Sequence, residues 1–110
     1  MSNEKDIGFV QQLVEATNTG KVSWQPTARI DEFTISFKGR FSLIIARPSQ
    51  GYFVFRMLDE GDREMLKLEY LEEDPGFGEL PVKSLYEAAR RQALQVDDAI
   101  DGILQELGKK

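Results

Sequence analysis

The chain has 110 residues, of which 41% are hydrophobic, and its 14 Lys and Arg against 19 Asp and Glu give a formal net charge of −5. This length and apolar content predict one compact domain, residues 1–110, rather than two domains or a disordered chain. Cysteine and histidine are both absent. Their absence excludes disulfides, Ser/His/Asp and Cys/His catalysis, and zinc sites built from these ligands.

The negative charge is concentrated in the second half of the chain. Residues 1–55 hold six basic and five acidic residues, whereas residues 56–110 hold eight and fourteen. A net acidic chain repels nucleic-acid phosphates, so nucleic acid is disfavoured as a partner. No apolar run reaches the roughly 18 residues of a membrane span, and the N-terminal residues lack the basic start and apolar block of a secretory signal. We therefore expect a cytoplasmic protein without a membrane partner.

The first element in chain order is an amphipathic helix, predicted from about residue 4 to residue 17. Its apolar face repeats at helical spacing, and Asn18 and Gly20 supply the ending signal. Residues 21–30 follow as an extended connector, because Pro26 disfavours a helix there. In this connector Trp24 either caps an open end of the core or forms an exposed recognition corner, and its burial decides between them. The apolar face of the helix comprises Ile7, Val10, Leu13, Val14 and Thr17.

Residues 32–70 show the two-residue alternation of a half-buried sheet, with turns predicted at Gly39, 48–51 and 59–62. Four antiparallel strands in a meander account for the pattern. The other face of the first strand is polar, which argues against an aromatic RNA-binding platform and assigns the seven phenylalanines to the core. The inward side chains are Phe33, Ile35, Phe37, Phe41, Leu43, Ile45, Phe53, Phe55, Met57, Leu66, Leu68 and Tyr70.

An acidic segment, LEEDPGFGELP, precedes the last helix and carries Glu72, Glu73, Asp74 and Glu79. Adjacent carboxylates can bind a hard cation or a basic partner. Their order does not match a twelve-residue calcium loop, and the PGFG sequence lacks the lysine of a phosphate-binding loop. We therefore expect no metal and no cofactor, and keep these four residues as candidate contacts for a protein partner.

The last element is predicted as one helix of about six turns. Ser84 and Glu87 form a capping box that would start it near Leu85. Its apolar stripe is interpreted as a core face, with a partner-facing or dimer-forming surface as the alternative. Arg90 and Arg91 belong to a solvated face or, alternatively, contact a partner. The stripe comprises Leu85, Ala89, Ala93, Val96, Ile100, Ile103 and Leu107.

Together these elements predict an α+β fold of order α-β-β-β-β-α, with both helices packed on the phenylalanine-rich face of the sheet. Two edge strands and a long striped helix favour a homodimer over a monomer.

Two resemblances add to this interpretation. The helix sequence LYEAARRQALQVDDAIDGIL and the earlier Trp24-Gln25-Pro26 segment resemble small uncharacterised bacterial α+β proteins, a group that implies no activity to transfer. In size, acidity and order of elements the chain is more loosely similar to type III secretion chaperones. That similarity implies an acidic homodimer that binds unfolded effector segments, although the chain lacks the further strands expected between two later helices.

Three classes of function follow. The first is a non-catalytic protein-binding or regulatory module, favoured by the absence of His and Cys and by the long last helix. The second is an immunity-type or secretion-chaperone-like acidic protein that binds a basic partner through salt-sensitive contacts. The third is a carboxylate-dependent enzyme or metal-binding protein. Acid and base roles cannot be assigned to any carboxylate pair from the sequence.

Overall fold

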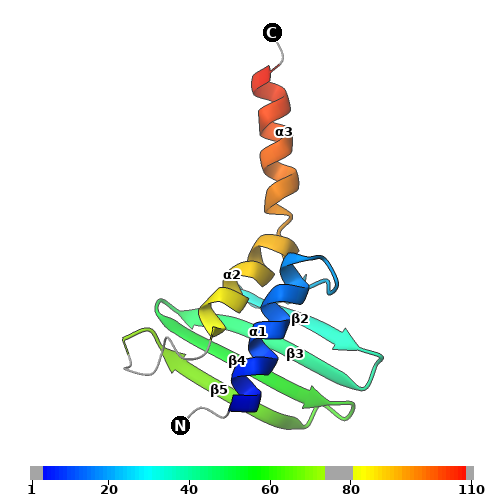
Figure 1. The fold of residues 1–110 in the computed structure, drawn as a ribbon, viewed down its shortest axis with the longest axis vertical. Helices are drawn as coiled ribbons and strands as arrows, with labels where there is room; N and C mark the ends of the chain where they lie inside the picture. Colours follow the sequence, from blue (N-terminus) through cyan, green and yellow to red (C-terminus); the bar gives the residue numbers. More distant parts are fainter. Residues whose placement is uncertain (1–3, 74–80, 109–110) are drawn as a thin grey trace.

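The computed structural model describes residues 4–73 and 81–108 and shows an α+β fold (Figure 1). The strands form one antiparallel sheet in the order β1-β2-β3-β4-β5, so the predicted meander is confirmed. The elements are α1 (Glu4–Asn18), β1 (Gln25–Pro26), β2 (Glu32–Phe37), β3 (Phe41–Ser49), β4 (Tyr52–Asp59), β5 (Glu64–Leu71), α2 (Val82–Ala93) and α3 (Val96–Gly108).

The helices α1 and α2 lie across the same face of the sheet, and the core fills the space between these two layers (Figure 1). The rings of Phe9 in α1 and Phe55 in β4 meet edge to face with centroids 5.9 Å apart. This packing confirms the predicted two-layer arrangement for these helices. The buried core comprises Val10, Leu13, Trp24, Phe33, Ile35, Leu43, Ile45, Phe53, Phe55, Val82, Leu85, Tyr86 and Ala89.

Within the described residues the sheet has five strands, not the four expected. The additional strand, β1, is only two residues long and pairs Gln25 with Thr34 and Pro26 with Phe33. Proline has no amide hydrogen to donate and is tolerated at a sheet edge, which is where β1 lies. A two-residue strand that contains proline leaves no alternation in the sequence, which is why the pattern of residues 21–30 predicts only an extended connector.

The predicted inward residues of β2, β3 and β4 are buried except at one end of the sheet. Phe37 and Phe41 are paired across the β2–β3 hairpin, and each remains 36% exposed. Lys38 and Gly39 form the hairpin turn with φ values of 53° and 69°, a left-handed conformation typical of tight hairpins. The assignment of all seven phenylalanines to the core therefore fails at this hairpin, and Phe77 lies outside the described residues.

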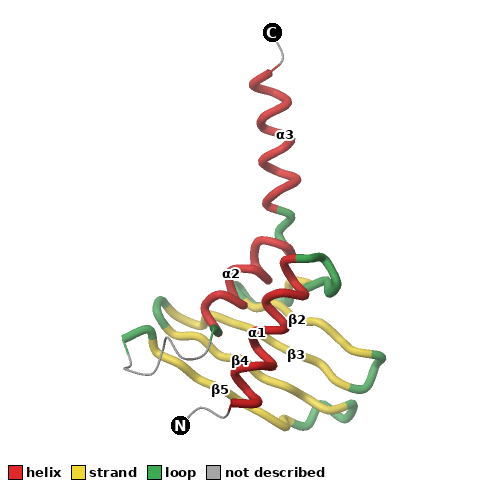
Figure 2. The backbone as a smooth tube through the Cα atoms, in the orientation of Figure 1, coloured by secondary structure: helices red, strands yellow, loops and turns green. Residues whose placement is uncertain are grey.

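The prediction of a single long C-terminal helix is wrong. Helix α2 ends at Ala93, and a second helix, α3, begins at Val96 (Figure 2). Gln95 has a φ of 55°, a left-handed conformation that cannot continue a right-handed helix. The predicted start is also wrong: α2 begins at Val82, its N-cap is Pro81, and no side chain among the described residues caps it by a hydrogen bond. Ser84 therefore lies inside the helix rather than at its cap.

The two halves of the predicted stripe have different environments. In α2, Leu85 and Ala89 are fully buried against the sheet. In α3, by contrast, none of the thirteen residues is buried, and the helix projects away from the sheet along the long axis of the molecule (Figure 1). The expected packing of both predicted helices on the sheet thus holds for α1 and α2 but not for the α3 part.

Candidate functional site

The most exposed apolar surface of the described chain is one face of α3. Ile100, Ile103, Leu104 and Leu107 are 41%, 59%, 59% and 67% exposed. Val96 begins the same face at the base of the helix and is half-buried. Scattered exposed aliphatic residues are common on protein surfaces, but a contiguous stripe of them marks an interaction surface.

The remaining surface of α3 is acidic. Asp97, Asp98, Asp101 and Glu106 lie in α3, which contains no Lys or Arg. Asp97 and Asp98 occupy the first turn, where negative charge interacts favourably with the helix dipole. The helix is therefore amphipathic in a simple sense, with aliphatic side chains on one face and carboxylates elsewhere.

The two candidate arginines lie near the junction of α2 and α3. Nε and Nη2 of Arg91 donate to Oδ1 of Asp97 at 3.0 and 2.5 Å, so Arg91 connects the end of α2 to the start of α3. Arg90 is exposed. Ion pairs between exposed groups contribute little to stability, and the Arg91–Asp97 pair mainly restrains the junction.

The acidic segment does not form a free cluster in the residues that the structure describes. Nζ of Lys83 donates to Oε2 of Glu72 at 2.7 Å, and the hydrogen bond and charge of Glu72 raise the pKa of Lys83. Glu73 is exposed. Asp74 and Glu79 lie outside the described residues. Within this segment the structure therefore describes one carboxylate paired with a lysine, Glu72, and one exposed carboxylate, Glu73.

Trp24 is buried, which decides against the exposed recognition corner, and with it against Trp24 as a partner contact. Only 2% of the residue is exposed, and its Nε1 donates to Oγ1 of Thr17 at 2.9 Å. Its backbone N–H donates to Oε1 of Gln92 at 2.7 Å, while Nε2 of Gln92 donates to the backbone carbonyls of Val22 and Thr17 at 2.6 and 3.3 Å. Trp24 caps the open end of the core, and Gln92 fixes its connector to the end of α2.

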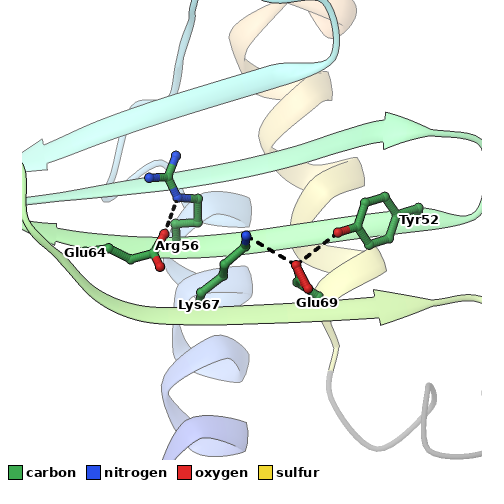
Figure 3. A network of polar contacts seen from close by, with 5 residues as sticks. All are labelled: Tyr52, Arg56, Glu64, Lys67 and Glu69. Carbon is green, nitrogen blue, oxygen red and sulfur yellow. Dashed lines mark hydrogen bonds and ion pairs between the residues drawn. The ribbon is translucent and has the colours of Figure 1, made fainter.

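The sheet face opposite the helices carries a polar network that the sequence did not single out (Figure 3). The hydroxyl of Tyr52 donates to Oε2 of Glu69 at 3.1 Å, and Nζ of Lys67 lies 3.3 Å from the same oxygen. Lys67 and then Tyr52 lower the pKa of Glu69, while loss of solvent around its hydroxyl and then the bond to Glu69 raise the pKa of Tyr52. Nε of Arg56 donates to Oε1 of Glu64 at 2.8 Å.

These charges satisfy one another across β4 and β5, as cross-strand pairs on a solvated face commonly do. Lys67 and Tyr52 lower the pKa of Glu69, which is the opposite of the raised pKa that a general acid needs. The network is therefore a set of paired charges on a solvated sheet face.

A second apolar feature lies at the exposed end of the β2–β3 hairpin. Phe9, Phe37, Phe41, Leu43 and Met57 line an open hollow of about 250 Å³. The guanidinium of Arg40 lies over the ring of Phe41, 5.6 Å from its centroid, and covers one side of that ring. The hollow is smaller than typical ligand pockets, which enclose about 300–1,000 Å³.

Two further properties concern metals and membranes. Within residues 4–73 and 81–108, no group of three or more acidic side chains is arranged to hold a metal ion. No helix in those ranges combines the length and the apolar content needed to cross a membrane.

No protein-family model, curated protein or solved structure matches this chain. The resemblance of its last helix to small bacterial proteins stays a prediction.

Proposed function

We propose that this chain is a non-catalytic protein-binding or regulatory module of the cytoplasm, and that α3 is the element through which it binds. The observation that carries the proposal is the exposed aliphatic stripe on a helix that has no buried residue. Isolated helices shorter than about 12–15 residues are marginal in water, so α3 needs a packing partner to be stable.

The free energy available from burying the stripe supports binding of modest strength. Full burial of a large aliphatic side chain contributes about 1.5–3 kcal/mol. Ile100, Ile103, Leu104 and Leu107 are between 41% and 67% exposed, so covering them contributes about 3–7 kcal/mol before the cost of association. Because that cost is of comparable size, we expect a weak, reversible complex rather than a permanent one.

The non-catalytic part of the proposal rests on the side chains available. The chain has no His and no Cys, so acid–base or nucleophilic chemistry would fall to carboxylates, Lys, Tyr, Ser or Thr. The carboxylates of the open sheet face are engaged with Arg56, Lys67 and Tyr52. A carboxylate-dependent enzyme needs a pair with separated pKa values in a shared pocket, and this network offers instead a set of neutralised charges.

A second candidate function is an acidic protein that binds a basic partner. The observation in its favour is that every charged residue of α3 is acidic, among them Asp97, Asp98 and Asp101. Salt separates the two candidates, because exposed charge pairs are screened at high ionic strength whereas apolar contacts are not.

The test is capture of partners by the tagged full chain from a lysate of the source organism, at low and at high salt. Ile103→Asp removes the centre of the stripe, and Ile30→Asp is the matched control, since Ile30 is 89% exposed and lies outside α3. Binding that survives high salt and the control but not Ile103→Asp supports α3. Binding lost in high salt and in an Asp98→Asn, Asp101→Asn variant supports the acidic alternative. Equal capture by every variant would refute both.

A further inference from the structure

The apolar positions of the stripe on α3 are arranged symmetrically along the helix, and this symmetry points to a second copy of the chain as the binding partner. We propose that α3 packs antiparallel against α3 of a second copy of this chain, forming a two-fold symmetric pair. This inference rests on the proposed function in one respect, since both require the stripe to be a binding surface. It goes further by naming the partner and the orientation.

The apolar positions of α3 are symmetric about the midpoint between Asp101 and Gly102. Reversing the helix about that point exchanges Val96 with Leu107, Ala99 with Leu104, and Ile100 with Ile103. In a two-fold pair the same surface serves both copies, so each residue must meet a suitable residue at the reversed position. Here every apolar position of the stripe meets another apolar position.

The spacing also matches a helix-pair seam. Val96, Ile100, Ile103 and Leu107 follow one another at steps of four, three and four, which is the repeat of the a and d positions in coiled coils. All four lie on the exposed or half-exposed face of α3. Asp98 and Asp101 fall at outer positions of the same repeat, so the pairing buries neither carboxylate.

Charge favours the antiparallel over the parallel arrangement. Asp97 and Asp98 occupy the first turn of α3, and a parallel pair would bring four carboxylates together at one end. An antiparallel pair places the two acidic turns at opposite ends and opposes the two helix dipoles.

The exposed area is sufficient for a weak dimer. Ile100, Ile103, Leu104 and Leu107 are between 41% and 67% exposed, or roughly 380 Å² per copy if a fully exposed aliphatic residue presents about 170 Å². Two copies with their flanking residues reach about 1,000 Å², the lower bound for a specific interface. We therefore expect dissociation in the micromolar range.

The shape of the molecule permits this pairing. Because α3 projects away from the sheet along the long axis (Figure 1, Figure 2), an antiparallel pair holds the two α+β bodies at opposite ends. The stripe is then covered without displacing α1 or α2 from the core.

The first experiment measures self-association of the purified full chain by sedimentation over a concentration series. Wild type and the Ile30→Asp control should dimerise equally, while Ile103→Asp should raise the dissociation constant at least about 100-fold, since the substitution enters the interface twice. None of the α3 residues belongs to the core, so the thermal stability of the α+β body reports whether the variant is folded. A wild type that stays monomeric at about millimolar concentration would overturn the proposal.

The second experiment tests the relative orientation of the two α3 helices. Because the chain has no cysteine of its own, only the introduced cysteines can form disulfides. Val96→Cys and Leu107→Cys variants are oxidised separately and as a mixture. The antiparallel pair predicts a crosslink only in the mixture, because residues 96 and 107 of one helix are about 16 Å apart along the axis and a disulfide requires Cα atoms within about 7 Å. Crosslinking of each variant alone would overturn the antiparallel orientation.

The outcomes separate this inference from the proposed function. A monomer that captures a cellular protein through Ile103 refutes the dimer and leaves the binding role of α3 intact. A monomer whose partner capture does not depend on Ile103 refutes both.

Discussion

Gln92→Ala tests the hydrogen-bonded clamp between the end of α2 and the Trp24 connector. The side chain makes three hydrogen bonds, accepting from the Trp24 N–H at 2.7 Å and donating to the carbonyls of Val22 and Thr17 at 2.6 and 3.3 Å. A hydrogen bond contributes about 0.5–1.5 kcal/mol net, and a buried group left unpaired costs more. Alanine gains a few tenths of a kcal/mol in helix propensity. We expect a loss of about 2–3 kcal/mol.

The assay is chemical denaturation followed by tryptophan fluorescence, because Trp24 is the only tryptophan of the chain and its amide is one of the groups released. At this chain length the loss corresponds to a melting temperature lower by about 8–15 °C. Gln11→Ala is the matched control, since Gln11 is also a helical glutamine but is exposed. A loss below about 0.5 kcal/mol, or one equal to that of the control, would refute the reasoning, because it would mean that solvent replaces the clamp at no cost.

Three further predictions concern other parts of the molecule. The hydroxyl of Tyr86 is buried and makes no hydrogen bond to a described residue, and its burial and then the nearby Asp31 carboxylate raise its pKa. Tyr86→Phe should therefore change the free energy of unfolding by less than about 1 kcal/mol. A loss above about 2 kcal/mol in thermal melts would contradict this. The N–H groups of Arg63 and Gly61 lower the pKa of Asp59 from its ordinary value of 3.8, so its stabilisation is complete above that value and is lost as pH falls through the lower folded-state pKa. Asp59→Asn, which keeps the acceptor oxygen, should flatten the dependence of melting temperature on pH between about 5 and 2.5, and an unchanged slope would exclude Asp59 as a source. A Cβ at Gly102 would meet nothing within 4 Å, so Gly102→Ala should stabilise helix α3 by about 1 kcal/mol and lower the dissociation constant of the dimer about five-fold or more. Circular dichroism measures the gain in helix and sedimentation the gain in association. Weaker association would place residue 102 inside the interface.

The sheet was predictable because its signals are local. Each of the strands β2 to β5 alternates apolar and polar residues, and each connecting turn contains glycine or the acidic residues that tolerate left-handed backbone. Gly39 and Gly51 adopt φ values of 69° and 76° at two of these turns, and Asp62 has a φ of 62° at the third. Alternation also predicted which side chains face the helices, and it failed at Phe37 and Phe41, which line an open hollow at the end of the β2–β3 hairpin and remain partly exposed.

The polar contacts of the candidate residues were not predictable in the same way. Trp24 is compatible by sequence with either a buried or an exposed position, and the contacts that bury it come from Thr17 and Gln92, the latter 68 residues away. The ion pair of Glu72 with Lys83 depends on how β5 and α2 approach each other. These are tertiary relations between polar residues, and no period in the sequence records them.

The helix break shows most clearly what a periodic pattern leaves undetermined. Leu85, Ala89, Ala93 and Val96 continue into Ile100, Ile103 and Leu107 without a change of spacing, so hydrophobicity alone predicts one helix with one buried face. Gln95 carries no proline or glycine signal, yet its φ of 55° ends α2. A left-handed residue without glycine costs about 1 kcal/mol, and the two ends it separates are joined by Arg91 and Asp97. By redirecting α3 away from the sheet, that one residue leaves the second half of the stripe exposed, whereas the same repeat packs α2 on the sheet.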